Sequence, residues 1–151
     1  MKSRRRAESQ SLMLPLFAYG TLRDPEYQRE LFGRTYGMQP ARVIGFVVVS
    51  TGGGYLAATA RPRATIDGAL VALDVSGYAL ADAWEDRSVY DRIAIEARTG
   101  DGRIRPCFIY VRPGARGVPI TDGRLADRPR TQVIADIRRF RASAGSDANR
   151  E

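Results

Sequence analysis

The chain has 151 residues, of which 44% are hydrophobic and 27% are charged, values typical of a single soluble globular domain. It contains no histidine, which excludes a Ser-His-Asp triad, a Cys-His pair and any metal site with histidine ligands. Acid–base chemistry must therefore use a carboxylate, a tyrosine or the single lysine, Lys2.

The net charge of +7 is concentrated near the two ends of the chain. Residues 1–12 carry a net charge of +3 and residues 124–142 carry +4, whereas residues 13–123 carry only +1. A polar tail and an arginine-rich last helix are typical of a solvated surface, so we expect no nucleic-acid partner. Contact of nucleic acid with this tail and helix is the weaker alternative.

The single cysteine, Cys107, cannot form a disulfide within the chain, which favours a reducing compartment. Its apolar neighbours predict a buried side chain rather than a catalytic thiol. No apolar run approaches the roughly 18 residues that a membrane-spanning helix needs. The basic residues 1–6 precede an apolar stretch too short for a signal peptide. We therefore expect a cytoplasmic protein with no membrane partner.

Two elements are predicted at the start of the chain. Residues 14–19 form a short apolar run that ends at Gly20, a pattern typical of a buried strand followed by a tight turn. Asp24-Pro25-Glu26 then predicts the start of a helix, with aspartate as its cap and proline at its first position. Gly33 predicts the end of this helix.

The next part of the chain favours strands. Three segments rich in β-branched and apolar residues are predicted strands: 41–50, 56–59 and 66–75. Pro62 is placed in the connection between the last two. The run Thr51–Gly54 is predicted to be a loop beside the site, because no lysine or serine follows it at the spacing of a phosphate-binding loop.

Two further helices are indicated by apolar residues at helical spacing. Ser76 predicts the cap of the first, which carries Leu80 and Trp84 on one face and ends at Glu85. The second is indicated by an apolar stripe under an arginine-rich face: Val133, Ile134, Ile137 and Phe140.

Between these helices the pattern alternates with a period of two residues, as in a hairpin. Residues 90–98 and 105–111 are predicted antiparallel strands, joined by a turn at Thr99–Gly102. Prolines and glycines then interrupt the pattern over residues 113–119. Strands outnumber helices, which predicts an α+β domain over residues 13–142, between disordered tails at 1–12 and 143–151.

Four motifs follow one another between residues 14 and 112. They are the run Phe17–Pro25 with Tyr19-Gly20-Thr21-Leu22 at its centre, Ile66–Leu70, Ala81–Glu85 with the following Tyr90-Asp91-Arg92, and Tyr110-Val111. In this order they resemble the γ-glutamylcyclotransferase-like family, especially its AIG2-like branch. The family usually has a leucine where this chain has Ala81.

The resemblance implies a fold and a site. The fold is a mixed β-barrel-like sheet with flanking helices and a cavity at one end. Glu85 corresponds to the family's proton acceptor, and Arg92 to a supporting residue. The substrate site would be lined by Tyr19, Gly20, Thr21 and Leu22, with Tyr90 beside them. No metal or cofactor is implied, and the sequence carries no signal for an oligomeric state.

The implied chemistry suits a single carboxylate. A γ-glutamyl compound carries its own nucleophile, the α-amine, within reach of its γ-carbonyl, so the enzyme need only hold the chain curled and remove a proton. Burial beside Trp84 is expected to raise the pKa of Glu85 toward neutrality. The expected products are 5-oxoproline and the free amine of a γ-glutamyl amine or amino acid. The alternative is a non-catalytic AIG2-like protein that binds a small metabolite or a protein partner in the same cavity.

Overall fold

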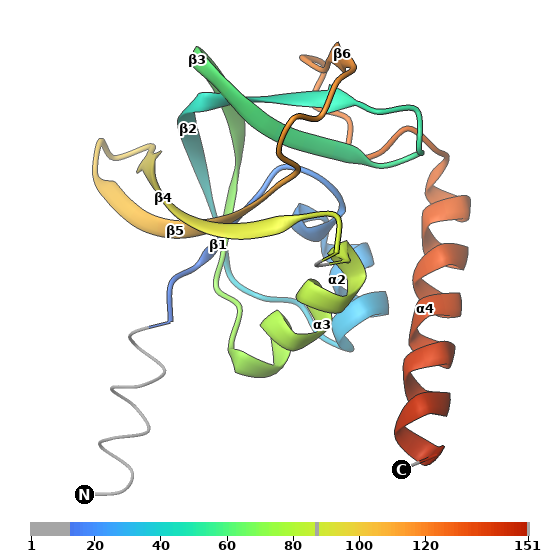
Figure 1. The fold of residues 1–151 in the computed structure, drawn as a ribbon. Coiled ribbons are helices and arrows are strands. Elements are labelled where there is room, and N and C mark those ends of the chain that lie inside the picture. The colour runs from blue at the N-terminus through green and yellow to red at the C-terminus, as the bar shows by residue number, and fades with distance from the viewer. Residues whose placement is uncertain (1–12, 87, 151) are drawn as a thin grey trace, which may run out of the picture.

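In residues 13–86 and 88–150, which the computed structural model describes, five strands close into a barrel flanked by three α-helices (Figure 1). The elements follow one another as β1 (Leu16–Ala18), the 3-10 turn η1 (Thr21–Arg23), α2 (Pro25–Phe32), β2 (Met38–Ser50), β3 (Leu56–Val71), α3 (Val75–Glu85), β4 (Asp91–Thr99), β5 (Ile104–Val111), β6 (Val118–Pro119) and α4 (Arg130–Arg150).

The barrel closes because several strands pair with more than one neighbour. Antiparallel pairs join β1 to β3, β3 to β2, β2 to β4 and β4 to β5. Parallel contacts from β5 to β1 and to β3 complete the ring. This mixed sheet confirms the α+β, barrel-like fold that the resemblance implied. The short β6 adds to β2 outside the ring.

Successive residues of the strands face two different cores, because side chains alternate along a strand. On β5, Cys107 and Ile109 pack in the barrel interior with side chains from the other four strands of the ring. Tyr110, between Ile109 and the end of the strand, packs instead with residues of the three helices. The prediction that Cys107 is buried is confirmed.

The helix α2 begins and ends where the sequence predicted. The carboxylate of Asp24 accepts a hydrogen bond from the amide of Tyr27 at 3.1 Å, and Pro25 occupies the first helical position. Gly33 ends the helix with a φ of 75°, a conformation that glycine adopts without steric cost.

The prediction for the start of α3 was wrong. Asp74 caps this helix, since its carboxylate accepts a hydrogen bond from the amide of Gly77 at 2.8 Å. Ser76 lies within the first turn and donates its hydroxyl to the same carboxylate. The preceding strand ends at Val71, so the aspartate that the sequence placed at the end of a strand is free to act as the cap.

The predicted strands 56–59 and 66–75 are one strand, β3, which contradicts the prediction that Pro62 lies in a connection. The register with β2 shifts beside Gly45, so residues 61–64 have no partner across the sheet. Pro62 has no amide hydrogen to donate, and at this irregularity none is needed. A proline can therefore lie within a long strand.

The C-terminal part of the chain holds two features that the pattern did not give. The two residues of β6 lie in the segment rich in proline and glycine and pair with the end of β2. The helix α4 is assigned as far as Arg150, beyond the predicted domain limit at residue 142. The domain limits stay predictions, and the predicted tail at 1–12 lies outside the described residues.

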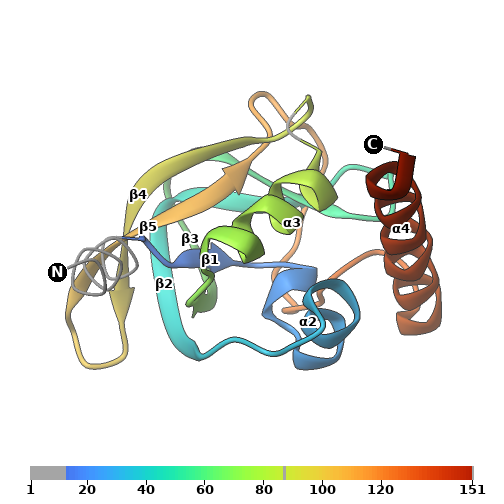
Figure 2. The same cartoon turned by 90° about the horizontal axis from the view of Figure 1, so that it is seen from below.

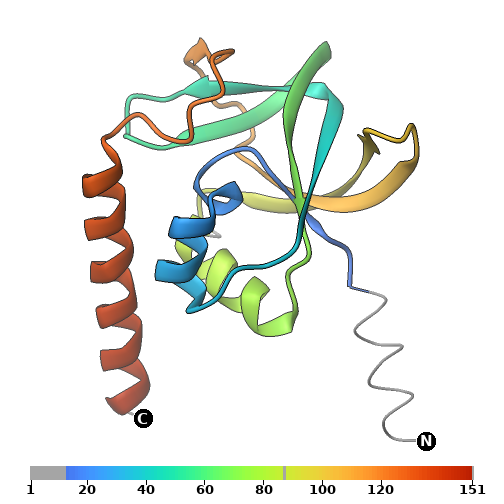
Figure 3. The ribbon, with the colours of Figure 1, turned by 180° about the vertical axis from the view of Figure 1, so that it is seen from behind.

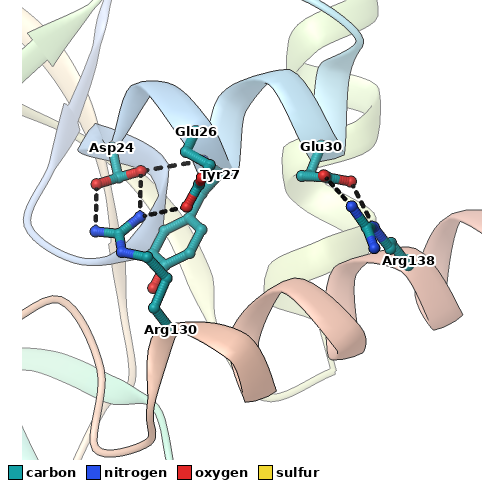
Figure 4. Close-up of polar contacts among 6 residues, drawn as sticks. All are labelled: Asp24, Glu26, Tyr27, Glu30, Arg130 and Arg138. Atoms are coloured by element: carbon teal, nitrogen blue, oxygen red, sulfur yellow. Dashed lines mark hydrogen bonds and ion pairs between the residues drawn. The ribbon is translucent and has the colours of Figure 1, made fainter.

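The helix α4 lies alongside α2, as Figures 2 and 3 show from two directions. Arg130 forms a two-bond ion pair with Asp24 at 2.8 and 3.0 Å, and Arg138 forms another with Glu30 at 2.8 and 3.1 Å (Figure 4). We call these two pairs the α2–α4 clasp. Beneath it, Val133 and Ile137 of α4 are buried in the helical core.

None of the described helices is both long and apolar enough to cross a membrane. The cytoplasmic localisation inferred from the sequence stays a prediction.

Candidate active site

A cavity of about 530 Å³ opens where the barrel meets the helices. This size suits a small-molecule ligand. Its walls come from the end of β1 and the following turn, the loop at residues 51–55, the end of α3, the end of β5 and the helix α4. The predicted site residues that line it are Tyr19, Gly20, Thr21, Leu22, Glu85 and Tyr90.

Glu85 is the last residue of α3 and lies in the cavity wall, as the motif predicted for the end of a helix. Its side chain is half-buried, and no hydrogen bond or ion pair to another described residue holds the carboxyl. Burial raises the pKa of Glu85 to about 7. Near neutral pH this carboxyl can therefore both accept and return a proton.

Three tyrosines surround the carboxyl, and their hydroxyls are fixed in place. The hydroxyl of Tyr19 donates to the carbonyl oxygen of Tyr110 at 2.7 Å and accepts from the amide of Ala58 at 3.1 Å. The hydroxyl of Tyr90 donates to the carbonyl oxygen of Leu56 at 3.1 Å. Each of the three hydroxyls thus already has an acceptor, since that of Tyr110 donates to a carboxylate.

These tyrosines stay protonated at neutral pH. Burial, followed by the charge of Glu85, raises the pKa of Tyr19 well above its usual value. The same two causes raise the pKa of Tyr90 to about 12, and burial raises that of Tyr110 further. Among the described groups of the cavity, Glu85 is thus the one suited to exchange protons near pH 7.

The turn after β1 lines the cavity with residues 20–22. No acceptor in the described part of the chain pairs with the N–H groups of Gly20, Thr21 or Leu22. The turn itself is held in place, because the carbonyl of Leu22 accepts from the buried amide of Gln28 at 2.8 Å. The hydroxyl of Thr21 accepts from the indole N–H of Trp84, next to Glu85, at 3.3 Å. The backbone N–H groups of Gly20, Thr21 and Leu22 can therefore bind an oxyanion or a carboxylate.

Arg92 does not line the cavity. Its guanidinium stacks on Tyr78 at 4.5 Å and on Phe108 at 4.8 Å, and it pairs with Asp82 at 3.4 Å. Asp82 also accepts a hydrogen bond from the hydroxyl of Tyr110 at 2.6 Å. Arg92 is therefore linked to the cavity wall only through Asp82, which contacts Tyr110.

The backbone directly after Glu85 is strained. Asp86 has a φ of 64°, in the left-handed region that side chains other than glycine seldom adopt. Its carboxylate accepts a hydrogen bond from the amide of Ser88 at 3.0 Å, and this local bond helps to hold the conformation. Strain of this kind gathers at functional sites.

Several residues of the cavity were not predicted from the sequence. Tyr55 comes from the glycine-rich loop, Arg112 follows the Tyr110-Val111 motif, and three others come from the C-terminal region: Arg128, Asp136 and Arg139. For Tyr110 the family motif gave a usable signal. Arg128, Asp136 and Arg139 reach the cavity only through the packing of α4 on α2, which no local pattern reveals.

No group of three or more His, Cys, Asp or Glu side chains in the described residues is placed to hold a metal ion. The ionisable groups that line the cavity are instead three carboxyls, of which Glu85 has a raised pKa and Asp86 and Asp136 have lowered ones, together with tyrosines and arginines.

The sequence model of the family described as "Gamma-glutamyl cyclotransferase, AIG2-like" matches residues 16–127 of this chain. The match contains every residue of the predicted site and ends before α4. No curated protein matches the sequence.

Several solved structures share the fold at low sequence identity. A solution structure of an Arabidopsis thaliana protein has a TM-score of 0.63 at 22% identity, covering 70% of this chain and 73% of that one. For a second A. thaliana protein the TM-score is 0.59 at 18% identity, with 66% of this chain and 61% of that one covered. A gamma-glutamyl cyclotransferase structure gives 0.55 at 18% identity and 66% coverage of both chains. This chain thus spans about three fifths to three quarters of these structures.

Proposed function

The chain belongs to the gamma-glutamyl cyclotransferase, AIG2-like family, and we propose that it converts a γ-glutamyl amine or γ-glutamyl amino acid into 5-oxoproline and a free amine. Glu85 is the proposed proton acceptor. The proposed substrate-binding residues are Tyr19, Gly20, Thr21, Leu22 and Tyr90. The observation that carries the proposal is a carboxyl with a pKa near 7 in the same cavity wall as backbone amides without an acceptor.

The proposed reaction is an intramolecular acyl transfer. Glu85 takes a proton from the α-ammonium group of the glutamyl moiety, and the resulting amine attacks the γ-carbonyl carbon. The electrons of the carbonyl move onto its oxygen. When this intermediate collapses, the carbonyl re-forms, the bond to the departing nitrogen breaks, and that nitrogen receives the proton from Glu85. The attacking nitrogen gives up its second proton, again through Glu85, to the departing amine, which leaves as an ammonium ion. The lactam and the amine leave, and Glu85 is again a carboxylate.

The cavity supports each of these steps. The amides of Gly20, Thr21 and Leu22 have no competing acceptor in the described chain and would stabilise the oxyanion. Arg112 also lines the cavity, and its positive charge favours negative charge near Tyr90. Its guanidinium has no ion pair among the described residues. It could therefore face the substrate's own α-carboxylate.

A panel of γ-glutamyl amines and amino acids, assayed for 5-oxoproline, tests this proposal. We expect product from at least one compound, and a fall of about 100-fold or more in kcat for Glu85→Gln. The control is Glu96→Gln, which removes an exposed carboxylate on β4 and should keep the wild-type rate. Product that is undiminished in Glu85→Gln would overturn the role of Glu85.

The alternative is that the cavity binds a metabolite or a partner without turnover. A thermal-shift screen separates the two cases, because a ligand that stabilises the chain and is recovered unchanged indicates binding alone. Formation of 5-oxoproline excludes this alternative.

A further inference from the structure

The helix α4 contributes to the cavity although it lies beyond the part of the chain that matches the family. The match ends at residue 127, yet Arg128, Asp136 and Arg139 line the same cavity as Glu85. The α2–α4 clasp and the buried side chains of Val133 and Ile137 hold the helix in this position (Figure 4). This end of the cavity therefore lies outside the family match, and its chemistry bears on what the chain binds.

Positive charge is in excess at the α4 end. Arg128 donates to Asp136 at 2.6 Å, and Arg139 lies 3.5 Å from the same carboxylate, so one carboxylate faces two guanidinium groups. Asp136 also accepts from the hydroxyl of Tyr55 at 2.6 Å and from the amide of Gln132 at 3.3 Å. The carboxylate is thus fully occupied, and one positive charge is not balanced within this group.

Arg128 also has a hydrogen-bond donor without an acceptor. Its Nε is buried and has no partner in the described part of the chain, although its terminal nitrogen pairs with Asp136. A buried guanidinium N–H that lacks an acceptor is unfavourable, and an anionic ligand would satisfy it. The unpaired donor and the excess charge therefore point to the same kind of ligand.

An aromatic wall connects this end of the cavity with Glu85. The ring of Trp84, next to Glu85, lies 5.5 Å from the ring of Tyr55, and the guanidinium of Arg128 lies 5.1 Å from the centre of that same ring. All of these side chains line the cavity. A substrate with its glutamyl group at Glu85 can thus extend its departing group along two aromatic rings to the arginines.

We propose that Arg128 and Arg139 form an anion subsite for the departing group, so that the preferred substrates are γ-glutamyl amino acids or short γ-glutamyl peptides with a free carboxylate. This inference rests on the proposed function, of which it names the substrate class. γ-Glutamyl amines with neutral or cationic departing groups are then poor substrates, because their departing group offers no acceptor to Arg128 and a cation is repelled.

A matched pair of substrates tests the proposal: a γ-glutamyl amino acid and the same compound with its departing carboxylate converted to a carboxamide. The wild-type chain should have a kcat/KM about tenfold or more higher for the acid. Arg128→Gln and Arg139→Gln should each lower this ratio, because kcat/KM falls more for the acid than for the carboxamide. Arg141→Gln, at an exposed position of α4 outside the cavity, is the matched control and should keep the wild-type ratio.

Arg128 also packs over the loop at residues 51–55, since a Cβ at Gly54 would lie 2.4 Å from the Nε of Arg128. Loss of the arginine side chain can therefore disturb the site as a whole. Equal losses for acid and carboxamide in both arginine variants would mean a structural role and would overturn the subsite, as would equal rates for the two compounds in the wild type. Arg128→Lys keeps the charge and should restore part of the preference.

The same pair of compounds also separates this inference from the proposed function. If neither compound is turned over, the proposed function fails, and calorimetric binding of both to the wild-type chain decides the subsite. Tighter binding of the acid that is lost in Arg128→Gln and Arg139→Gln supports it. Equal affinities for the two compounds contradict it.

Discussion

The raised pKa of Glu85 has a measurable consequence for stability. Burial holds the pKa of this carboxyl at about 7 in the folded chain, against 4.5 when it is exposed. Between these values the folded chain binds more protons than the unfolded chain, so the free energy of unfolding falls as the pH rises from about 4.5 to about 7. Below this window the carboxyl is neutral in both states, and above it the buried charge destabilises the fold.

The magnitude follows from the two pKa values. A pKa difference of one corresponds to about 1.4 kcal/mol, which gives an upper limit of about 3 kcal/mol for the ionised carboxyl. Because the side chain is only half-buried, water screens part of the charge and we expect about 2 kcal/mol. Glu85→Gln removes the ionisation. The variant should therefore gain about 2 kcal/mol relative to the wild type between pH 5 and pH 8.5.

Urea unfolding of both chains at several pH values measures this difference. The chain has no histidine, so few other groups change charge over this range. The matched control is Glu96→Gln, which makes the same substitution at an exposed position of β4. A wild-type-minus-variant difference for Glu85→Gln that stays constant from pH 5 to pH 8.5 would refute the buried-carboxyl reasoning.

Three further predictions concern residues around the site and in the barrel. Tyr19→Phe removes two buried hydrogen bonds to the backbone and should cost about 1–3 kcal/mol of unfolding free energy in urea; a cost under about 0.5 kcal/mol would contradict these hydrogen bonds. Gly68→Ala places a Cβ 2.5 Å from the carbonyl oxygen of Ala18 and should cost about 1–3 kcal/mol, whereas an unchanged urea midpoint would contradict this packing. Burial raises the pKa of Cys107 to about 11, so the folded chain should not react with a thiol reagent at pH 7 until urea unfolds it; rapid labelling without urea would count against its burial.

The parts of the fold that local chemistry determines were predicted from the sequence. Asp24, Pro25 and Gly33 set the bounds of α2 through local effects. Asp24 accepts a hydrogen bond from a free amide of the first turn, Pro25 suits the first helical position, and Gly33 adopts the positive φ that ends the helix. The end of α3 at Glu85 also agrees with the prediction. The hairpin of β4 and β5 followed from alternation and from a turn rich in glycine.

Features that depend on contacts between distant segments were not predicted. Pro62 lies inside β3 because the pairing of β2 with β3 shifts at Gly45. A propensity scale considers one segment at a time and contains no information on the strand that pairs with it. The cap of α3 was misassigned for a related reason, since Asp74 becomes available only when β3 ends early. In both cases the sequence predicted the type of element correctly and its boundary wrongly.

The same division applies to the candidate site. The motif residues from Tyr19 to Leu22 and the two residues Glu85 and Tyr90 were named from the sequence, and they line one cavity. Arg128 and Asp136 reach that cavity only because α4 packs on α2 more than 100 positions away in the chain. A single sequence gives no signal for such a contact, although it can show that a basic helix is present.

The central claim is that Glu85 accepts the proton in a cyclisation, and the pH dependence of 5-oxoproline release tests it most directly. The wild-type kcat/KM should rise with pH and level off above about 7, where the carboxyl is ionised. The residual rate of Glu85→Gln should lack this rise. A wild-type profile that is flat from pH 5 to pH 8, or a Glu85→Gln profile that matches it, would contradict the claim.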